Sequence, residues 1–323
     1  MTMSADRLDA SVLSSLSSCP RRACAKCGTT EEIPDGSPLW PNTWRCSVCG
    51  YGLTVRNGFV QLAADLDDVD EGFDLASFDR LRKIEDDHFW FTTRNEMIVW
   101  LVERFAAQAD RALEIGCGTG YVLFAFRRAL SSARLAGSEL HSLGLVHARQ
   151  RHGQAVELVQ MDARYIGLSD ALDLVGAFDV LEHIADDRRV LDEFYRVLKP
   201  GGVLIATVPQ HPSLWSAADE VAHHQRRYRM GELASKARHA GFMIRYQSSF
   251  AALTLPLMAL SRLRTRLLNR DNAMKGLDVE TKVSPHLNAA LRLVLRSEHV
   301  LRRLGFPLPL GGSQVVVAAK PHS

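Results

Sequence analysis

The sequence predicts an α/β fold with a mostly parallel, Rossmann-like sheet from residue 77 onward. From residue 111, apolar segments of strand length alternate with segments of helical periodicity, the pattern of βαβ units. A glycine-rich loop at 116–120 follows the first apolar segment directly and leads into a helix-like stretch. Lys199-Pro200-Gly201-Gly202 has the composition of a helix stop and turn before another strand.

The individual elements follow from the same periodicities. Strands are expected at 111–116, 134–139, 156–160, 173–180 and 202–208, and helices near 120–130, 142–152, 187–198 and 230–240. Two further strands, 242–250 and 313–320, are expected to form an antiparallel pair at the edge of the sheet. The stretch between them, 251–308, is expected to be a mostly helical, arginine-rich insertion.

The loop after the first strand is the most informative motif. Its glycines are Gly116, Gly118 and Gly120, and Glu114 lies two residues ahead. Tyr121 follows Gly120, so the dinucleotide pattern G-x-G-x-x-G is not completed. Glycines here allow a sharp turn and a close approach of a small molecule to the main chain. A tight turn without a ligand is the alternative.

Acidic residues stand at the ends of the next two strands, where ligands bind in open α/β sheets. Glu139 closes the second strand and could accept both hydroxyls of a ribose; otherwise it is an ordinary surface glutamate. Asp162 lies just past the third strand, with Ala163 after it.

In combination, these motifs resemble the class I S-adenosylmethionine (SAM)-dependent methyltransferases. The resemblance covers roughly residues 85–250 and includes Phe178-Asp179-Val180-Leu181-Glu182-His183-Ile184 and the segment 198–202. It implies a seven-stranded sheet, SAM as methyl donor, and Asp162 at the adenine amino group. The cofactor-binding residues it implies are Glu114, Gly116, Cys117, Gly118, Gly120, Glu139, Leu140, Asp162, Ala163, Phe178 and Asp179.

A narrower resemblance points to a bacterial subgroup that often accompanies glycan, lipid or secondary-metabolite pathways. It rests on His88-Phe89-Trp90-Phe91 with Arg94-Asn95, on the segment 215–228, and on Asn288, Glu298 and 311–313. It implies a small-molecule, glycan or lipid-linked acceptor, methylated at oxygen. The amino-terminal cysteines depart from this subgroup and are similar to those of rRNA guanine methyltransferases and sugar C-methyltransferases.

Four of the six cysteines form two C-x-x-C knuckles separated by 18 residues. This spacing predicts a structural, tetrahedral Zn²⁺ site, and a cytosolic chain disfavours the disulfide alternative. The expected ligands are Cys24, Cys27, Cys46 and Cys49, with Cys19 a less well spaced substitute for Cys24. The expected organisation is a flexible amino terminus (1–18), a zinc ribbon (19–63), an acidic solvated linker (64–76) and a methyltransferase domain (77–323).

Methyl transfer to a hydroxyl requires removal of a proton, for which a histidine is suited. His183 and His224 are the candidate general bases, although each could instead have a structural role. A further set could contact the acceptor. It comprises Phe89, Trp90, Arg94, Arg227 and Tyr228. The alternative for the aromatics at 89–91 is core packing, and the alternative for Arg227 is a solvated face that pairs with Asp219 and Glu220.

Charge and hydropathy limit the possible partners. The formal net charge is +2, which speaks against nucleic acid as a partner. Residues 1–18 lack the apolar run of a signal peptide, so a cytoplasmic protein is expected. Arginines from Arg262 to Arg270 alternate with leucines in a pattern that would suit peripheral contact with an anionic membrane, a roof over the active site, or a helix packed on the domain. An RNA methyltransferase and a non-catalytic SAM-binding scaffold are the alternative functions.

Overall fold

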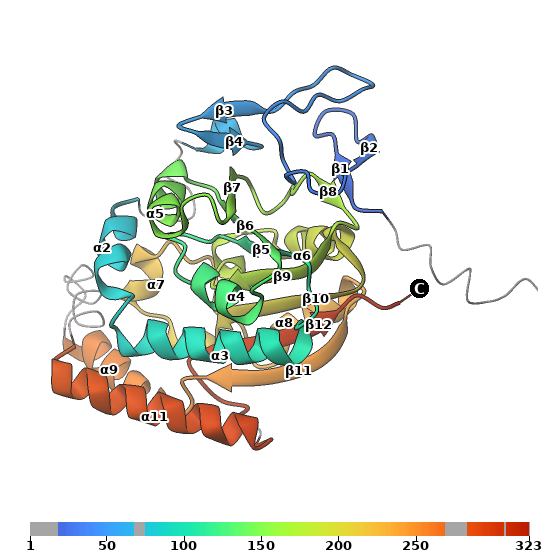
Figure 1. Cartoon of the computed structure of the whole chain (residues 1–323). Coiled ribbons are helices and arrows are strands. Elements are labelled where there is room, and N and C mark those ends of the chain that lie inside the picture. The colour runs from blue at the N-terminus through green and yellow to red at the C-terminus, as the bar shows by residue number, and fades with distance from the viewer. Residues whose placement is uncertain (1–18, 68–74, 269–282, 307, 323) are drawn as a thin grey trace, which may run out of the picture.

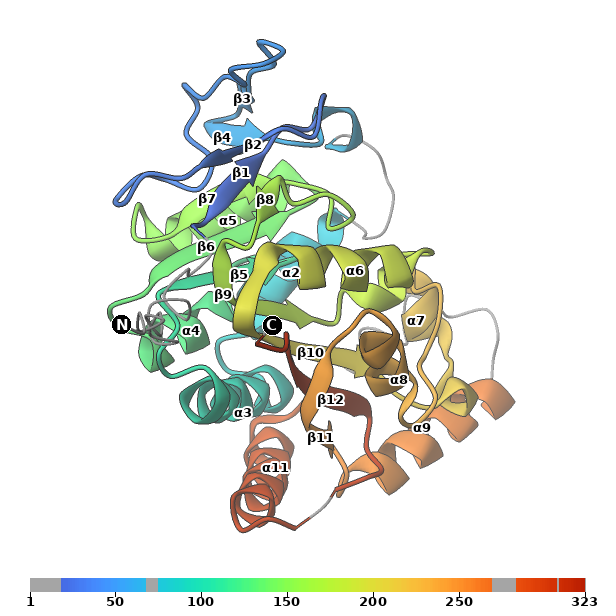
Figure 2. The same ribbon diagram turned by 90° about the vertical axis from the view of Figure 1, so that its right-hand side faces the viewer.

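The computed structural model describes residues 19–67, 75–268, 283–306 and 308–322. Its main sheet contains the seven strands expected for this fold, in the order β11-β12-β10-β9-β5-β6-β7 (Figures 1 and 2). β12 runs antiparallel to both of its neighbours, and the other described pairings among these seven strands are parallel. The strands are β5 (Arg111–Ile115), β6 (Arg134–Glu139), β7 (Glu157–Gln160), β9 (Leu172–Phe178), β10 (Leu198–Pro209), β11 (Met243–Phe250) and β12 (Ser313–Ala319).

The amino-terminal segment lengthens this sheet to nine strands, two more than expected. The hairpin of β3 (Thr54–Arg56) and β4 (Phe59–Gln61) joins the edge, where β4 pairs in parallel with β7. A second sheet places β1 (Arg21–Ala23) between β2 (Thr30–Glu32) and β8 (Leu168–Ser169). Strands from the expected ribbon therefore share both sheets with strands from the expected methyltransferase domain.

Helices cover both faces of the main sheet, because the side chains of each central strand alternate between two apolar cores. Leu113 and Ile115 of β5 face the core that holds α6 and α8, whereas Ala112 faces the core that holds α3, α4 and α5 (Figure 2). The helices of the domain are α2 (Ala76–Ile84), α3 (Phe89–Phe105), α4 (Leu123–Ala129), α5 (Ser142–His152), α6 (Asp187–Val197), α7 (Ala217–Val221), α8 (Glu232–His239), α9 (Leu255–Leu268) and α11 (Pro285–Arg303). Short 3₁₀ turns occupy Ala64–Leu66 (η1), Leu181–His183 (η2) and Pro212–Leu214 (η3).

The insertion is helical in its described parts, as expected. α11 lies along α3 (Figure 1), and the Asn288 side chain accepts a hydrogen bond from the backbone N–H of Phe89, which begins α3. Arg262 of α9 is buried and turned toward the domain, so it does not belong to an exposed basic face. The side chains of Arg264 and Arg266 and the whole of Arg270 lie outside the described residues. Within the described residues, no helix combines the length and apolar character needed to cross a bilayer.

The described part of the linker contains one acid that is not solvated. Asp67 is buried, and its carboxylate accepts hydrogen bonds from the backbone N–H of Ser142 at 2.6 Å and from the Ser142 hydroxyl at 2.7 Å. It thus satisfies the amino terminus of α5 from outside the helix, as a capping carboxylate does. The expectation of a wholly solvated connector is therefore wrong at this residue.

Candidate functional site

The glycine loop leaves β5 at the carboxyl end of the sheet. Gly116, Gly118 and Gly120 all have positive φ angles, of 64°, 51° and 80°. A Cβ at Gly116 would lie 2.6 Å from a Val180 methyl carbon, and one at Gly120 would lie 3.0 Å from the Cα of Ala148. Gly116 and Gly120 therefore allow tight packing, whereas a Cβ at Gly118 would only reach ordinary van der Waals contact, at 3.8 Å.

Two carboxylates flank this loop. Glu139 faces the loop rather than solvent: it accepts hydrogen bonds from the backbone N–H groups of Gly118 at 3.0 Å and Leu140 at 2.8 Å. Glu114 is 2% exposed, and in the described part of the chain one of its carboxyl oxygens, Oε2, has no hydrogen-bond partner. Burial raises the pKa of Glu114 well above its usual value, against the opposing effect of the Arg94 cation.

Other expected cofactor residues lie nearby but differ in what they can offer. The Phe178 ring packs in the core at 6.1 Å from the ring of Phe126, and the Cys117 thiol also points into the core, so only their main chains can line the site. This corrects any expectation of side-chain contacts from these two residues. Asp162, followed by the buried Ala163, is ion-paired with Arg164 at 2.6 Å.

An aromatic side chain that the residue pattern did not identify as part of the site covers the loop. Phe78 of α2 is 2% exposed, and its ring edge would lie 3.8 Å from a Cβ at Gly118 and 2.9 Å from one at Gly144. Glu85, which follows α2, accepts hydrogen bonds from Thr119 of the loop and from Arg151 of α5. α2 thus covers the glycine loop. The helical periodicity before β5 predicts a helix, but it does not predict where that helix packs.

Arg94 of α3 is paired with a residue at the end of β9. It forms an ion pair with Asp179, and its guanidinium lies 4.3 Å from the centroid of the Trp90 ring. Asp179 itself has a φ of 59° and accepts a hydrogen bond from the Thr207 hydroxyl at 3.1 Å. The structure therefore brings Arg94 and Trp90 to the carboxyl end of β9, and their contact with an acceptor stays a prediction. Phe89 is half-buried at the start of α3, where it packs against the core.

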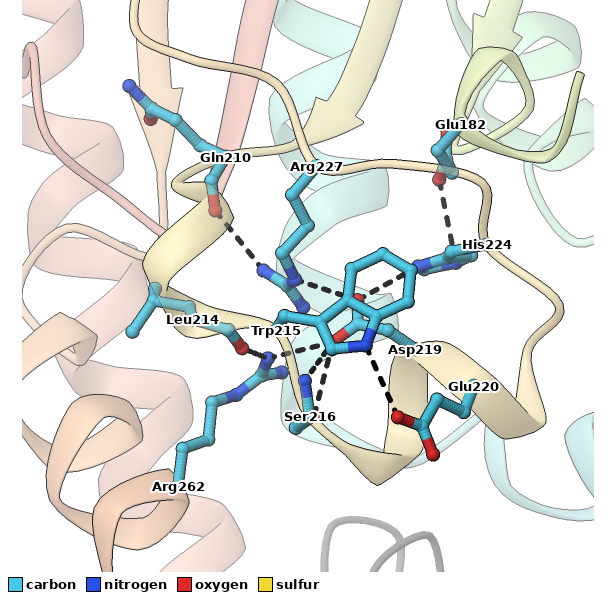
Figure 3. A network of polar contacts seen from close by, with 10 residues as sticks. All are labelled: Glu182, Gln210, Leu214, Trp215, Ser216, Asp219, Glu220, His224, Arg227 and Arg262. Atoms are coloured by element: carbon cyan, nitrogen blue, oxygen red, sulfur yellow. Dashed lines mark hydrogen bonds and ion pairs between the residues drawn. The ribbon is translucent and has the colours of Figure 1, made fainter. Parts of the chain in front are cut away.

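Beyond β10, a buried carboxylate organises the next part of the site (Figure 3). Asp219 is 1% exposed and accepts hydrogen bonds from His224 Nδ1 at 2.9 Å and from Arg227 Nε at 2.7 Å. Arg262 Nη1 lies 3.2 Å from its other oxygen. Burial alone would raise the pKa of Asp219, but His224 and the two arginines together hold it below its usual value.

The two candidate histidines lie together. The ring centroids of His183 and His224 are 4.7 Å apart, and His224 Nε2 is 3.9 Å from a carboxyl oxygen of Glu182 (Figure 3 shows the latter pair). Glu182 is fully buried, and burial followed by the nearby Asp179 raises its pKa well above the usual value. The sequence motif contained Glu182, but nothing in its spacing identified it as a site residue.

Two expected acceptor contacts are not supported. Arg227 is buried in its ion pair with Asp219 and donates to the carbonyl of Gln210, so it is neither free for an anionic acceptor nor on the surface. Tyr228 is fully buried in the core, where its hydroxyl donates to Asp187 at 2.6 Å. Sequence periodicity cannot reveal such orientations in an irregular loop.

The four knuckle cysteines converge. Cys24 Sγ lies 3.6 Å from Cys49 Sγ, Cys27 Sγ lies 3.6 Å from Cys46 Sγ, and all four sulfurs are within 4.8 Å of one another. Tetrahedral Zn–S bonds of 2.3 Å place sulfurs about 3.8 Å apart, so the spacing fits a zinc ion. Cys19 is exposed and outside this cluster.

Comparisons with known proteins agree with this geometry. A family model described as "Methyltransferase domain" matches residues 113–206. A probable SAM-dependent methyltransferase of Mycolicibacterium smegmatis is 29% identical over 170 residues, 50% of this chain and 62% of the relative. A ubiquinone biosynthesis O-methyltransferase of Pseudomonas putida is 27% identical over 161 residues, 45% of this chain and 66% of the relative. The chain thus spans less than two thirds of the length of these relatives.

A solved structure shares the fold. A chain in the Haloferax volcanii complex that contains the Trm112 methyltransferase activator superposes with a TM-score of 0.53 at 20% identity, covering 77% of this chain and 99% of that one. Together with the strand order and the glycine loop, these similarities show that the chain contains a methyltransferase domain with the fold of the class I SAM-dependent methyltransferases.

Proposed function

We propose that this protein transfers a methyl group from SAM to an oxygen atom of a small-molecule, glycan or lipid-linked acceptor. The observation that carries the donor half of this proposal is the buried Glu114 carboxyl oxygen without a partner, beside a loop whose Gly118 is free of a Cβ. SAM carries an ammonium and a sulfonium group. A buried carboxylate beside a main chain without a Cβ suits such a cation.

Bound SAM supplies an electrophilic methyl carbon. Glu114 would face its positive charges, and Glu139, already held at the loop by two backbone N–H groups, would accept from the ribose. Asp162 would have to share its carboxylate between Arg164 and the adenine amino group. Such positioning supplies much of the rate in an in-line transfer, because the reacting atoms are held in line and close together.

The acceptor half would lie beyond β9 and β10. The acceptor hydroxyl must lose its proton, and the adjacent His183 and His224, the latter 3.9 Å from Glu182, are the candidate general bases. The named relative in ubiquinone biosynthesis, an O-methyltransferase, supports oxygen as the methylated atom.

We further infer that the cysteine cluster holds a structural Zn²⁺. Four protein thiolates would close its coordination shell, so the ion would stabilise the fold and take no part in methyl transfer.

Calorimetric titration with SAM tests the proposed function. The wild-type protein is expected to bind SAM, and Gly118→Arg is expected to abolish binding because its side chain would fill the face of the loop on which Phe78 now rests. Gly58→Arg is the matched control, since Gly58 also has a positive φ but lies in the β3–β4 hairpin with no atom within 4 Å of its Cβ position. A wild-type protein that ignores millimolar SAM would refute the proposal.

A further inference from the structure

Glu182, His183 and His224 form a second cluster with the donor atoms of a metal site. One ligand atom from each lies within 4.8 Å of the other two. Glu182 is 0% exposed, and neither of its carboxyl oxygens has a hydrogen-bond partner among the described residues. A buried carboxylate left in this way is strongly unfavourable unless a proton or a cation compensates it.

The neighbouring charges do not supply that cation. Arg94 forms its ion pair with Asp179, and Arg227 and Arg262 both pair with Asp219. These three guanidinium groups therefore each have another acidic partner. None of them donates a hydrogen bond to Glu182.

The orientation of His224 also fits a metal ligand. Its Nδ1 is engaged by the Asp219 carboxylate at 2.9 Å, which leaves Nε2 directed toward Glu182 at 3.9 Å (Figure 3). Metal-binding histidines commonly use one ring nitrogen for the ion and donate the other N–H to a carboxylate, which fixes the tautomer and the ring orientation. Asp219 would be the positioning residue for this ligand.

We propose that Glu182, His183 and His224 bind a divalent first-row transition-metal ion. Two imidazoles and one carboxylate are a donor set suited to ions such as Mn²⁺, Fe²⁺ or Zn²⁺, and harder ions such as Mg²⁺ prefer oxygen alone. Three protein ligands leave coordination positions open, in contrast to the closed cysteine site.

The open positions suggest a use that rests on the proposed function. An acceptor hydroxyl that occupied one of them would release its proton to solvent water more readily, because a cation lowers the pKa of a coordinated oxygen acid. The two histidines would then act as ligands rather than as general bases. Metal binding itself does not depend on this use and can be tested without any acceptor.

Mn²⁺ titration followed by electron paramagnetic resonance tests the proposal in the full-length protein. Mn²⁺ favours imidazole and carboxylate over thiolate, so it reports on this cluster rather than on the cysteine site. The free Mn²⁺ signal is expected to fall until a single ion is bound per chain. Glu182→Gln and His224→Gln should each weaken binding by about 100-fold or more, whereas His223→Gln, an exposed neighbour, should bind as the wild type does.

Thermal unfolding guards against variants that merely misfold. Mn²⁺ should raise the Tm of the wild type and of His223→Gln, and it should leave the Tm of folded Glu182→Gln unchanged. Wild-type protein that binds SAM but takes up no Mn²⁺, or a Glu182→Gln variant that binds Mn²⁺ with unaltered affinity, would overturn the metal site while leaving the proposed methyl transfer intact. Failure to bind SAM would instead count against the proposed function.

Discussion

Glu114, the proposed contact for the SAM cation, is expected to lower the free energy of unfolding at neutral pH. Its carboxyl group is buried beside the glycine loop with one oxygen unpaired, and burial raises its pKa. The folded state therefore binds this proton more tightly than the unfolded chain, for which the pKa is about 4.3. The free energy of unfolding must then fall as the pH rises above that value. The unfolded chain ionises freely there, whereas the folded protein must either keep Glu114 protonated or bury its charge.

Glu114→Gln is expected to remove this dependence. Glutamine does not titrate, so the variant does not lose the stability that the wild type loses. The difference in free energy of unfolding, variant minus wild type, should therefore increase from pH 4 toward pH 7 by on the order of 1 kcal/mol. Its affinity for SAM should fall by about 10- to 100-fold through loss of a charge-assisted contact. Urea unfolding across this pH range and calorimetry with SAM measure the two effects.

Glu103→Gln is the control, since Glu103 is exposed on α3. If Glu114→Gln destabilised the protein at pH 7, or bound SAM as tightly as the wild type, the assigned role of Glu114 would be wrong.

Residue types and their spacing predicted the parts of the site that depend on main-chain geometry. The positive φ angles of Gly116 and Gly118 and the position of Glu139 at the tip of β6 follow from a strand–loop–helix pattern. The inward orientation of Tyr228 does not, because it depends on Asp187, which lies 41 residues away along the chain. Arg227 forms the alternative ion pair with Asp219, only eight residues away, but this pair is buried rather than solvated.

At the level of elements, α2 determines access to the glycine loop. Phe78 occupies the open side of Gly118, and Glu85 ties the end of α2 to Thr119 and Arg151. SAM could reach the loop only after the Phe78 ring has moved, so the binding-competent conformation would be a minor one in the free protein.

Phe78→Ala is therefore expected to speed SAM association by about tenfold, since it removes the side chain that must move and enlarges the competent fraction. The same change should lower the free energy of unfolding by about 3–5 kcal/mol through loss of buried packing. Stopped-flow fluorescence measures the rate, and chemical unfolding measures the stability.

Phe194→Ala provides a matched loss of core packing on α6, on the other face of the sheet, and should leave the association rate unchanged. Equal or slower association in Phe78→Ala would show that α2 does not gate the loop.

Periodicity located these elements well where side chains alternate between two cores. The expected strands 111–116 and 134–139 match β5 and β6 within a residue. It failed where pairing with a distant strand decides the outcome: β10 begins at Leu198 rather than at residue 202, because Leu198 pairs with Leu172 before an irregularity in the ladder. The pairing of β4 with β7 could likewise not be predicted, since a residue pattern does not determine which strand is the partner.

In the whole molecule, the cysteine-bearing segment is built into the methyltransferase sheet. The Glu157 carboxylate at the start of β7 accepts the backbone N–H groups of Leu39 and Trp40 at 2.8 and 2.7 Å. At the other end of β7, the Gln160 side-chain amide donates to the carbonyls of Ala63 and Leu140. Leu140 directly follows the proposed ribose ligand, so this contact chain connects the ribbon to the cofactor site.

Loss of the proposed zinc ion should consequently affect the entire protein rather than the ribbon alone. Cys46→Ser is expected to lower the Tm in a single unfolding transition and to weaken SAM binding, because the β4–β7 edge and the Gln160 contacts lose their support. Calorimetric unfolding and SAM titration measure both effects, and Cys19→Ser is the control because Cys19 is exposed and outside the cluster. Two separate transitions, with SAM affinity unchanged, would instead mean that the ribbon folds as an independent module and that its pairing with β7 contributes nothing to the donor site.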